Sequence, residues 1–199
     1  MSEKMMENNK VNLRKRKGTI LIIVLNLLLF IALNLLPSIE ENLLLNPEFS
    51  VIIEKPWTLV TVIFSHQLLL HFLINMVLLF IFGLELEKIT SSRIVISLYV
   101  FAGLVGSIAV VPASVLGRSD DLIAGASAAV FALVAAFAVM RPEASIFRSK
   151  AKMWAAALFF FNAITLFINP QMAQSAFAHI TGILVGIIVG YWIRAFKIV

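Results

Sequence analysis

Long apolar runs dominate the chain, with little of the alternation typical of strands or of the one-sided pattern typical of surface helices. A transmembrane helix needs about 20 apolar residues, within a range of about 17–25. Continuous runs exclude a β-barrel, whose strands alternate, so helices must satisfy the backbone groups in lipid. Six runs are candidates for such helices: Thr19–Leu36, Leu69–Glu87, Ile94–Val111, Ser127–Met140, Met153–Ile168 and Phe177–Ile193. The pattern predicts an all-α, polytopic bundle of six transmembrane helices.

The fourth and fifth runs are shorter than a bilayer normally requires. A short span must either thin the bilayer or begin below its surface, in a cavity lined by protein. The second arrangement would suit a buried active site.

Composition supports an integral, multi-pass membrane protein. Of the 199 residues, 61% are hydrophobic and 14% are charged, whereas soluble domains have about 45–50% and about 25%. A chain of this length is expected to form one compact bundle, so we predict a basic tail over residues 1–18 and one membrane domain over 19–199. The absence of cysteine excludes disulfides, thiolate metal sites and a cysteine nucleophile.

The basic residues are distributed as membrane topology requires. All 16 of them except Lys55 and Arg118 lie before the first run, in the second and fourth connections or after the last run. The positive-inside rule therefore places both termini in the cytoplasm, and we expect a cell-membrane location. The net charge of +5 needs no nucleic-acid partner. The first run is long, and no small-residue cleavage site follows it, so we interpret it as a retained anchor.

One long connection, Pro37–Leu68, separates the first two spans. It contains several apolar stretches, so we expect it to lie in the outer membrane interface. Trp57 would suit the aromatic belt there, and Tyr191 and Trp192 would suit the inner belt.

Four polar residues are expected to meet at one depth near the outer face. The second, fourth and sixth spans cross the membrane in the same direction. His71 and Asn75 begin the second span, Ser127 begins the fourth and His179 begins the sixth. Taken singly, each could simply hydrogen-bond or pack between helices. Together they indicate a functional site, because polar groups in hydrocarbon are costly.

Small residues spaced by four would let the fourth and sixth spans approach closely. The fourth span offers Ala128, Ala132 and Ala135 or Ala136, and the sixth offers Gly182, Gly186 and Gly190. Such packing would bring Ser127 and His179 toward the separation of about 2.6–3.2 Å expected of a nucleophile and its base.

These residues also form recognisable motifs. In chain order they are His66 followed by His71-x-x-x-Asn75, Gly83-x-x-x-Glu87, Gly125-x-Ser127, and Ala178-His179-x-x-Gly182-x-x-x-Gly186. In order and spacing, the chain resembles the rhomboid family of intramembrane serine proteases from about Thr19 to Arg194.

The resemblance implies roles for these residues. Ser127 resembles the nucleophile and His179 the general base, in a dyad without an aspartate. His71 and Asn75 resemble the side chains that bind the oxyanion together with the Ser127 N–H. Supporting roles are implied for His66, Gly125, Phe131, Gly182 and Gly186, and structural roles for Gly83 and Glu87. Without an aspartate, the tautomer of His179 would have to be held by packing, for example against Phe131.

A protease of this kind acts on a transmembrane protein substrate within the lipid bilayer. We expect no metal and no cofactor, and the sequence does not decide the oligomeric state. Water would reach the site through an outward-facing cavity lined by residues such as His66 and Gln67. The family's fifth helix acts as a gate, and Phe159, Phe160, Phe161 and Phe167 could form it here or could face lipid.

Two departures and two alternative functions remain at this stage. Ala128 follows the serine where the family often has glycine, and Thr58 follows Trp57 where it often has arginine. A catalytically inactive rhomboid relative that binds membrane proteins would fit the same architecture, although such relatives usually lack the serine or the histidine. A small transporter or channel would need polar residues along a whole path, whereas here they gather at one depth.

Overall fold

Helices account for almost all of the regular structure in the computed structural model, which describes residues 17–117, 122–169 and 172–196. Five segments are long and apolar enough to cross a membrane, and α9 is a sixth, shorter apolar helix among them. In order they are α2 (Lys17–Leu35), α6 to α7 (Leu69–Ile89), α8 (Ser92–Gly117), α9 (Ser127–Met140), α10 (Ala151–Ile168) and α11 (Ala173–Phe196). The predicted all-α bundle is confirmed. Of the expected basic tail, residues 1–16 lie outside the described chain.

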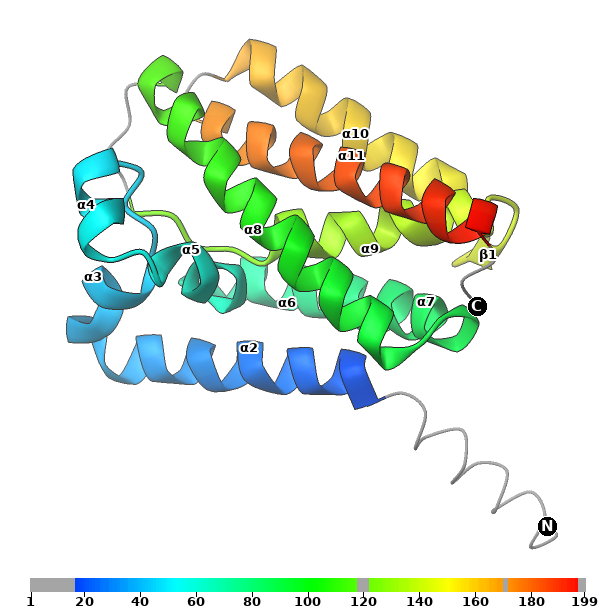
Figure 1. Ribbon diagram of the computed structural model, residues 1–199, viewed down its shortest axis with the longest axis horizontal. Helices are drawn as coiled ribbons and strands as arrows, with labels where there is room; N and C mark the ends of the chain where they lie inside the picture. Colours follow the sequence, from blue (N-terminus) through cyan, green and yellow to red (C-terminus); the bar gives the residue numbers. More distant parts are fainter. Residues whose placement is uncertain (1–16, 118–121, 170–171, 197–199) are drawn as a thin grey trace, which may run out of the picture.

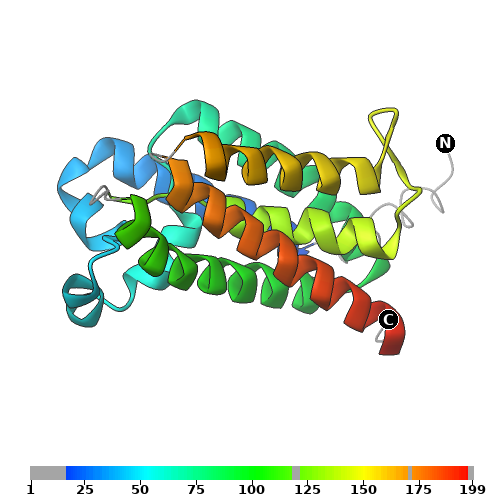
Figure 2. The same cartoon turned by 90° about the horizontal axis from the view of Figure 1, so that it is seen from above.

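Helix α9 lies at the centre of the bundle, in contact with α6, α8, α10 and α11; Figures 1 and 2 show it enclosed by longer helices. Every residue from Ser127 to Ala138 is buried. A helix of 14 residues is about 21 Å long, well short of the hydrocarbon thickness of about 30 Å. It therefore crosses only part of the bundle.

The chain reaches the beginning of α9 through a non-helical segment, residues 122–126. Ile123 pairs with Leu45 of the long connection through two backbone hydrogen bonds of 3.1 and 2.9 Å. The Gly125 N–H donates to the Val62 carbonyl at 3.3 Å. These bonds hold in place the segment that leads into Ser127.

The long connection between the first two spans folds into short helices that cover one end of the bundle (Figure 1). They are η1 (Pro37–Ile39), α3 (Glu40–Leu43), α4 (Phe49–Glu54), α5 (Thr58–Thr61) and η2 (Val62–Phe64). The Trp57 Nε1–H donates to the Asn42 carbonyl at 2.8 Å, and the Thr58 hydroxyl to the Lys55 carbonyl at 2.7 Å. Thr58 thus stabilises its own turn. The location of this connection in the outer interface remains a prediction.

The second span is continuous, but its middle turn is π-helical. It comprises α6 (Leu69–Leu78), the π-helical turn η3 (Leu79–Gly83) and α7 (Leu84–Ile89). Within the turn, the Phe82 ring lies 6.0 Å from that of Phe137 and 5.7 Å from that of Trp154. Hydropathy predicted the span closely, but it gave no sign of the π turn.

Most helix boundaries differ from the predictions by a few residues, and three of these differences concern the ends of α8, α10 and α11. Helix α8 continues through Pro112 to Gly117 instead of ending at Val111. Proline lacks an N–H but is tolerated in membrane helices, where neighbouring groups compensate. Helix α10 begins two residues earlier than predicted, after the hairpin of β1 (Ser145–Ile146) and β2 (Ser149–Lys150). Helix α11 begins four residues earlier, so His179 lies in its second turn rather than its first.

A buried carboxylate attaches α2 to the second span. Glu87 is only 3% exposed and accepts hydrogen bonds from the N–H groups of Gly18 and Thr19, at 2.9 and 3.0 Å. The Thr19 hydroxyl adds a third bond at 2.5 Å. These N–H groups begin a helix, where they lack partners within the helix and favour negative charge. The structural role expected of Glu87 is therefore a cap for α2.

The beginning of α2 and the end of α11 lie at the same end of the bundle (Figure 1). An even number of crossings is consistent with the prediction that both termini share one compartment. That this compartment is the cytoplasm remains a prediction from the charge distribution.

Candidate active site

Ser127 and His179 face each other across the contact between α9 and α11. The Ser127 Oγ lies 2.5 Å from the His179 Nε2. The Phe131 ring, one turn along α9, packs at 4.8 Å from the imidazole ring. Ser127 is the first residue of α9, so its N–H has no partner within the helix. A hydroxyl, a nitrogen base and an N–H that no carbonyl of its own helix uses therefore lie close together.

The two helices come this close because glycines on α11 face alanines on α9. A Cβ atom added to Gly182 would lie 2.2 Å from the Ala128 carbonyl oxygen, and one added to Gly186 would lie 2.2 Å from that of Ala132. Both distances are far below van der Waals contact. Farther along, Gly190 faces Ala136, one of the two alternatives left open by the sequence. Any side chain at Gly182 or Gly186 would push His179 away from Ser127.

Gly125 leaves room beside the serine. Its φ of +154° is unfavourable for residues with a side chain, and an added Cβ would lie 2.9 Å from His71 Cε1. The same point lies 3.4 Å from Ser127 Oγ and 3.5 Å from His71 Nε2. The hydroxyl and the His71 ring thus border one small space, which glycine keeps open.

Asn75 lies one turn below His71 on α6 and is only 1% exposed. Its Nδ2 donates to the His71 carbonyl at 3.0 Å, which leaves a second N–H on the amide nitrogen. Its Oδ1 is buried without a hydrogen-bond partner in the described part of the chain. A buried amide with unused hydrogen-bonding capacity is unusual enough to suggest a functional role.

His66 supports His71 from within the protein. It is fully buried, and its ring meets those of His71 and Phe72 edge to face, at 5.1 and 5.5 Å. Neither ring nitrogen has a hydrogen-bond partner of normal geometry among the described residues. Burial, followed by the proximity of His71, lowers the pKa of His66 to about 3. His66 is thus held as a neutral ring.

The expected pair of cavity-lining residues is not found. His66 is buried instead of lining an open cavity, because the turn before α6 packs it against His71 and Phe72. Gln67 is exposed, and its Nε2 lies 3.4 Å from Glu40 of the long connection.

The methyl group of Ala128, where the family often has glycine, points to α8. A Cβ added to Gly106 would lie 2.6 Å from Ala128 Cβ. The missing side chain of Gly106 thus makes room for the methyl group of Ala128, on the α8 side of the helix. This packing gives no indication that the methyl group crowds the space beside Ser127.

Asn162, a polar residue in the apolar run of α10, was not among the predicted site residues. Its Oδ1 lies 2.7 Å from the His179 Nδ1, so packing against Phe131 is not the only contact that orients the imidazole. An asparagine within a membrane span is itself a functional signal, and this signal could have identified it.

The aromatic residues of α10 are mainly on its outer surface. Phe160, Phe161 and Phe167 are exposed, whereas Phe159 is partly buried against the core. The first three are therefore available to lipid. Whether α10 acts as a gate remains a prediction.

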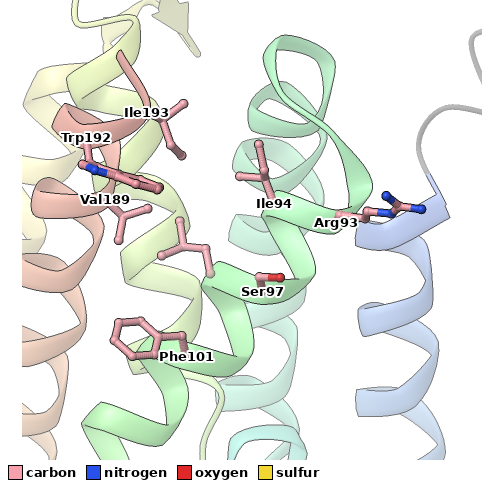
Figure 3. A pocket seen from close by; sticks show the side chains of 8 residues that line it. Arg93, Ile94, Ser97, Phe101, Val189, Trp192 and Ile193 are labelled. Atoms are coloured by element: carbon pink, nitrogen blue, oxygen red, sulfur yellow. The ribbon is translucent and has the colours of Figure 1, made fainter. Parts of the chain in front are cut away.

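A separate groove lies between the other ends of α8 and α11, far along both helices from Ser127. Figure 3 shows its apolar wall, including Phe101, Val189 and Trp192, with the Arg93 guanidinium pointing away from Trp192. The lining contains the Ser97 hydroxyl but no histidine, aspartate or glutamate that could act as its base. Among the described residues, no three His, Asp or Glu side chains could hold a metal ion together.

Comparison with known proteins identifies the family to which the chain is similar. The profile of the Rhomboid domain matches residues 54–196. The chain is also 31% identical, over 139 residues, to "RHOMBOID-like protein 6, mitochondrial" from Arabidopsis thaliana. That alignment covers 69% of this chain but only 44% of the relative. The chain therefore spans less than half the length of this relative.

Proposed function

Because the chain belongs to the rhomboid family, we propose that it is an intramembrane serine protease that cleaves peptide bonds in transmembrane proteins. The main observation in support is the 2.5 Å contact between Ser127 Oγ and His179 Nε2. It joins two residues 52 positions apart on two helices whose small residues permit close approach. In this proposal Ser127 is the nucleophile and His179 is the general base.

The reaction begins when His179 Nε2 removes the proton from the Ser127 hydroxyl. The serine oxygen attacks the carbonyl carbon of the scissile peptide, and a tetrahedral intermediate forms. Its collapse breaks the C–N bond, and the departing amine takes the proton from His179. A water molecule, deprotonated by His179, then hydrolyses the acyl-enzyme and regenerates the serine.

The negative oxygen of the intermediate needs donors already in position. The Ser127 N–H at the beginning of α9 has no partner within its own helix and lies at the positive end of a helix dipole. The His71 ring borders the space beside Ser127 Oγ, and Asn75 has a second amide N–H. We assign these three groups to the oxyanion site, where the loss of one donor typically costs about 10²–10³-fold in rate.

The proposed substrate is a membrane-spanning helix that enters from the lipid. A helix conceals its carbonyl groups in hydrogen bonds, so the scissile segment must unwind before attack. We expect cleavage near glycine, proline or other residues that weaken a helix. No cofactor is needed for this chemistry.

The proposed location is a cell membrane, with both termini in the cytoplasm. The relative from Arabidopsis is named as mitochondrial, so the organelle is the alternative. Because the chain contains no cysteine, a single cysteine can be introduced at Glu54 or at Ser149. Its side of the membrane is then tested with a thiol reagent that does not cross the bilayer. Labelling at Glu54 from outside and at Ser149 only after permeabilisation is expected; the reverse would overturn the topology.

The decisive experiment compares wild type, Ser127→Ala and His179→Ala with a single-span substrate in liposomes. Loss of cleavage in both variants, with unchanged thermal unfolding, would support the dyad. An active-site fluorophosphonate should label wild type but not Ser127→Ala. A folded wild type that neither cleaves several substrates nor takes up the probe would contradict the protease and favour an inactive, membrane-protein-binding rhomboid. Cleavage by Ser127→Ala would exclude Ser127 as the nucleophile.

A further inference from the structure

Asn162 is a buried polar residue on a helix whose other described residues are mostly not buried. Only Ala151 and Asn162 are buried on this helix, and Asn162 is 3% exposed. The helix lies beside α11 in both views (Figures 1 and 2). An amide between membrane helices needs a partner, and its partner is His179.

The hydrogen bonds of Asn162 fix the direction of its amide. The Nδ2 donates to the Leu158 carbonyl at 2.8 Å, a bond that an oxygen could not make. The Oδ1 therefore faces the His179 Nδ1, at 2.7 Å. Since an amide oxygen only accepts, the Nδ1 must carry the proton.

The position of this proton determines which imidazole nitrogen can act as a base. A neutral imidazole has one N–H, so a proton on Nδ1 leaves Nε2 free. That nitrogen lies 2.5 Å from Ser127 Oγ. The tautomer selected by Asn162 is the one that can accept the serine proton. The opposite tautomer would point an N–H at the hydroxyl.

We propose that Asn162 is the positioning residue of a Ser127–His179–Asn162 triad, an inference that rests on the proposed protease function. When Ser127 Oγ bonds to the carbonyl carbon, its proton moves to Nε2, and the Nδ1–H remains bonded to Asn162. The positive charge on the imidazole leaves again with the proton that goes to the amine. A Cys-His-Asn arrangement performs the same task in papain-like proteases.

An amide suits this position better than a carboxylate does. A charged side chain in the bilayer is costly unless paired, whereas Asn162 is neutral and both of its polar groups are bonded within the protein. The arrangement also makes catalysis depend on α10. Because Asn162 belongs to this sparsely buried helix, His179 is held in the correct tautomer only while α10 contacts α11.

The test uses Asn162→Leu, which keeps the branching at Cγ but removes the acceptor, and Asn162→Asp, which keeps an acceptor oxygen. Thr165→Val is the matched control, because it removes another polar group of α10, one bonded to the Phe161 carbonyl. In Asn162→Leu we expect kcat to fall about 10²-fold with little change in KM, less than the about 10⁴-fold loss when a charged triad aspartate is replaced. Thr165→Val should behave like wild type.

Asn162→Asp should keep more activity than Asn162→Leu and move the acid side of its kcat–pH profile to higher pH. The reason is that a carboxylate favours the protonated imidazole. If Asn162→Leu does not fold, the kcat–pH profile of Asn162→Asp tests the proposal instead. A shift to higher pH supports the positioning role of Asn162, and a profile like that of wild type overturns it. Normal kcat in a folded Asn162→Leu protein would also overturn it.

A second readout does not depend on activity. The chain has three histidines, so ¹⁵N-histidine spectra can be assigned by difference with His179→Ala. Wild-type His179 should show a protonated Nδ1, and Asn162→Leu should show a mixture of tautomers. If wild type is inactive but this difference is present, the proposed protease function fails while the Asn162 contact stands. An unchanged tautomer would overturn the positioning role.

Discussion

Helices α9 and α10 form two walls of the same site, but they are held in opposite ways. On α9, the residues from Ser127 to Ala138 are all buried, and glycines of α11 press against its backbone. On α10, only Ala151 and Asn162 are buried. The proposed nucleophile thus belongs to a tightly packed helix, whereas the residue proposed to orient the base belongs to a helix with little buried surface. Such helices open at a lower free energy than a core helix does.

The largest expected effect compares one phenylalanine on each helix. Phe137 of α9 is 3% exposed, and Phe161 of α10 is 67% exposed. Replacing a buried phenylalanine by alanine costs about 3–5 kcal/mol, whereas an exposed one changes stability by about 0.5 kcal/mol or less. Phe137→Ala should therefore lower the free energy of unfolding in mixed micelles far more than Phe161→Ala. Equal losses would remove the distinction between the two helices.

A smaller effect tests the packing of Ala128 against Gly106. Gly106→Ala adds a methyl group where the Ala128 methyl group already lies, and overpacking costs about 1–3 kcal/mol. Ala128→Gly alone should keep activity. In the double variant with Gly106→Ala, it should restore most of the stability that Gly106→Ala loses. Gly103→Ala is the matched control, because its methyl group would meet Ile63 instead. If Ala128→Gly rescues both glycine variants equally, the contact is not specific.

The third effect is spread over several pH units and concerns the buried His66. Its pKa is about 3 in the folded protein, against an ordinary value of 6.5. Between these two values the unfolded chain binds more protons, so stability falls as the pH is lowered. The slope contributed by this group is at most about 1.4 kcal/mol per pH unit.

Thermal unfolding from pH 7 to pH 4 measures this slope, with His66→Asn as the variant that does not titrate. The melting temperature of wild type should fall more steeply with acid than that of His66→Asn. Parallel curves would show that His66 is not held neutral by burial.

The features of the fold that depend on local composition could be predicted from the sequence. Apolar runs and basic flanks placed six spans to within a few residues at most boundaries, because these signals lie within each segment. The meeting of Ser127 and His179 could be inferred because span direction and small residues together restrict how α9 and α11 pack. The roles of the two residues remain proposals.

Other features depend on how helices are rotated against each other. The π turn at Leu79–Gly83 accompanies the contacts of Phe82 with two other helices, which hydropathy does not report. Asn162 faces His179 rather than lipid only because of the rotation of α10. The continuation of α8 past Pro112 likewise depends on neighbouring groups, whereas the sequence shows only a residue that often ends helices.

Glu87 makes the first span and the rest of the protein depend on each other. The Rhomboid profile begins at residue 54, so α2 lies outside the matched region, yet the beginning of α2 supplies three of the hydrogen bonds to this buried carboxylate. A descendant that lost α2 would leave the carboxylate without these donors, and one that lost the carboxylate would leave the beginning of α2 uncapped. In evolutionary terms, the first helix and Glu87 should be gained and lost together.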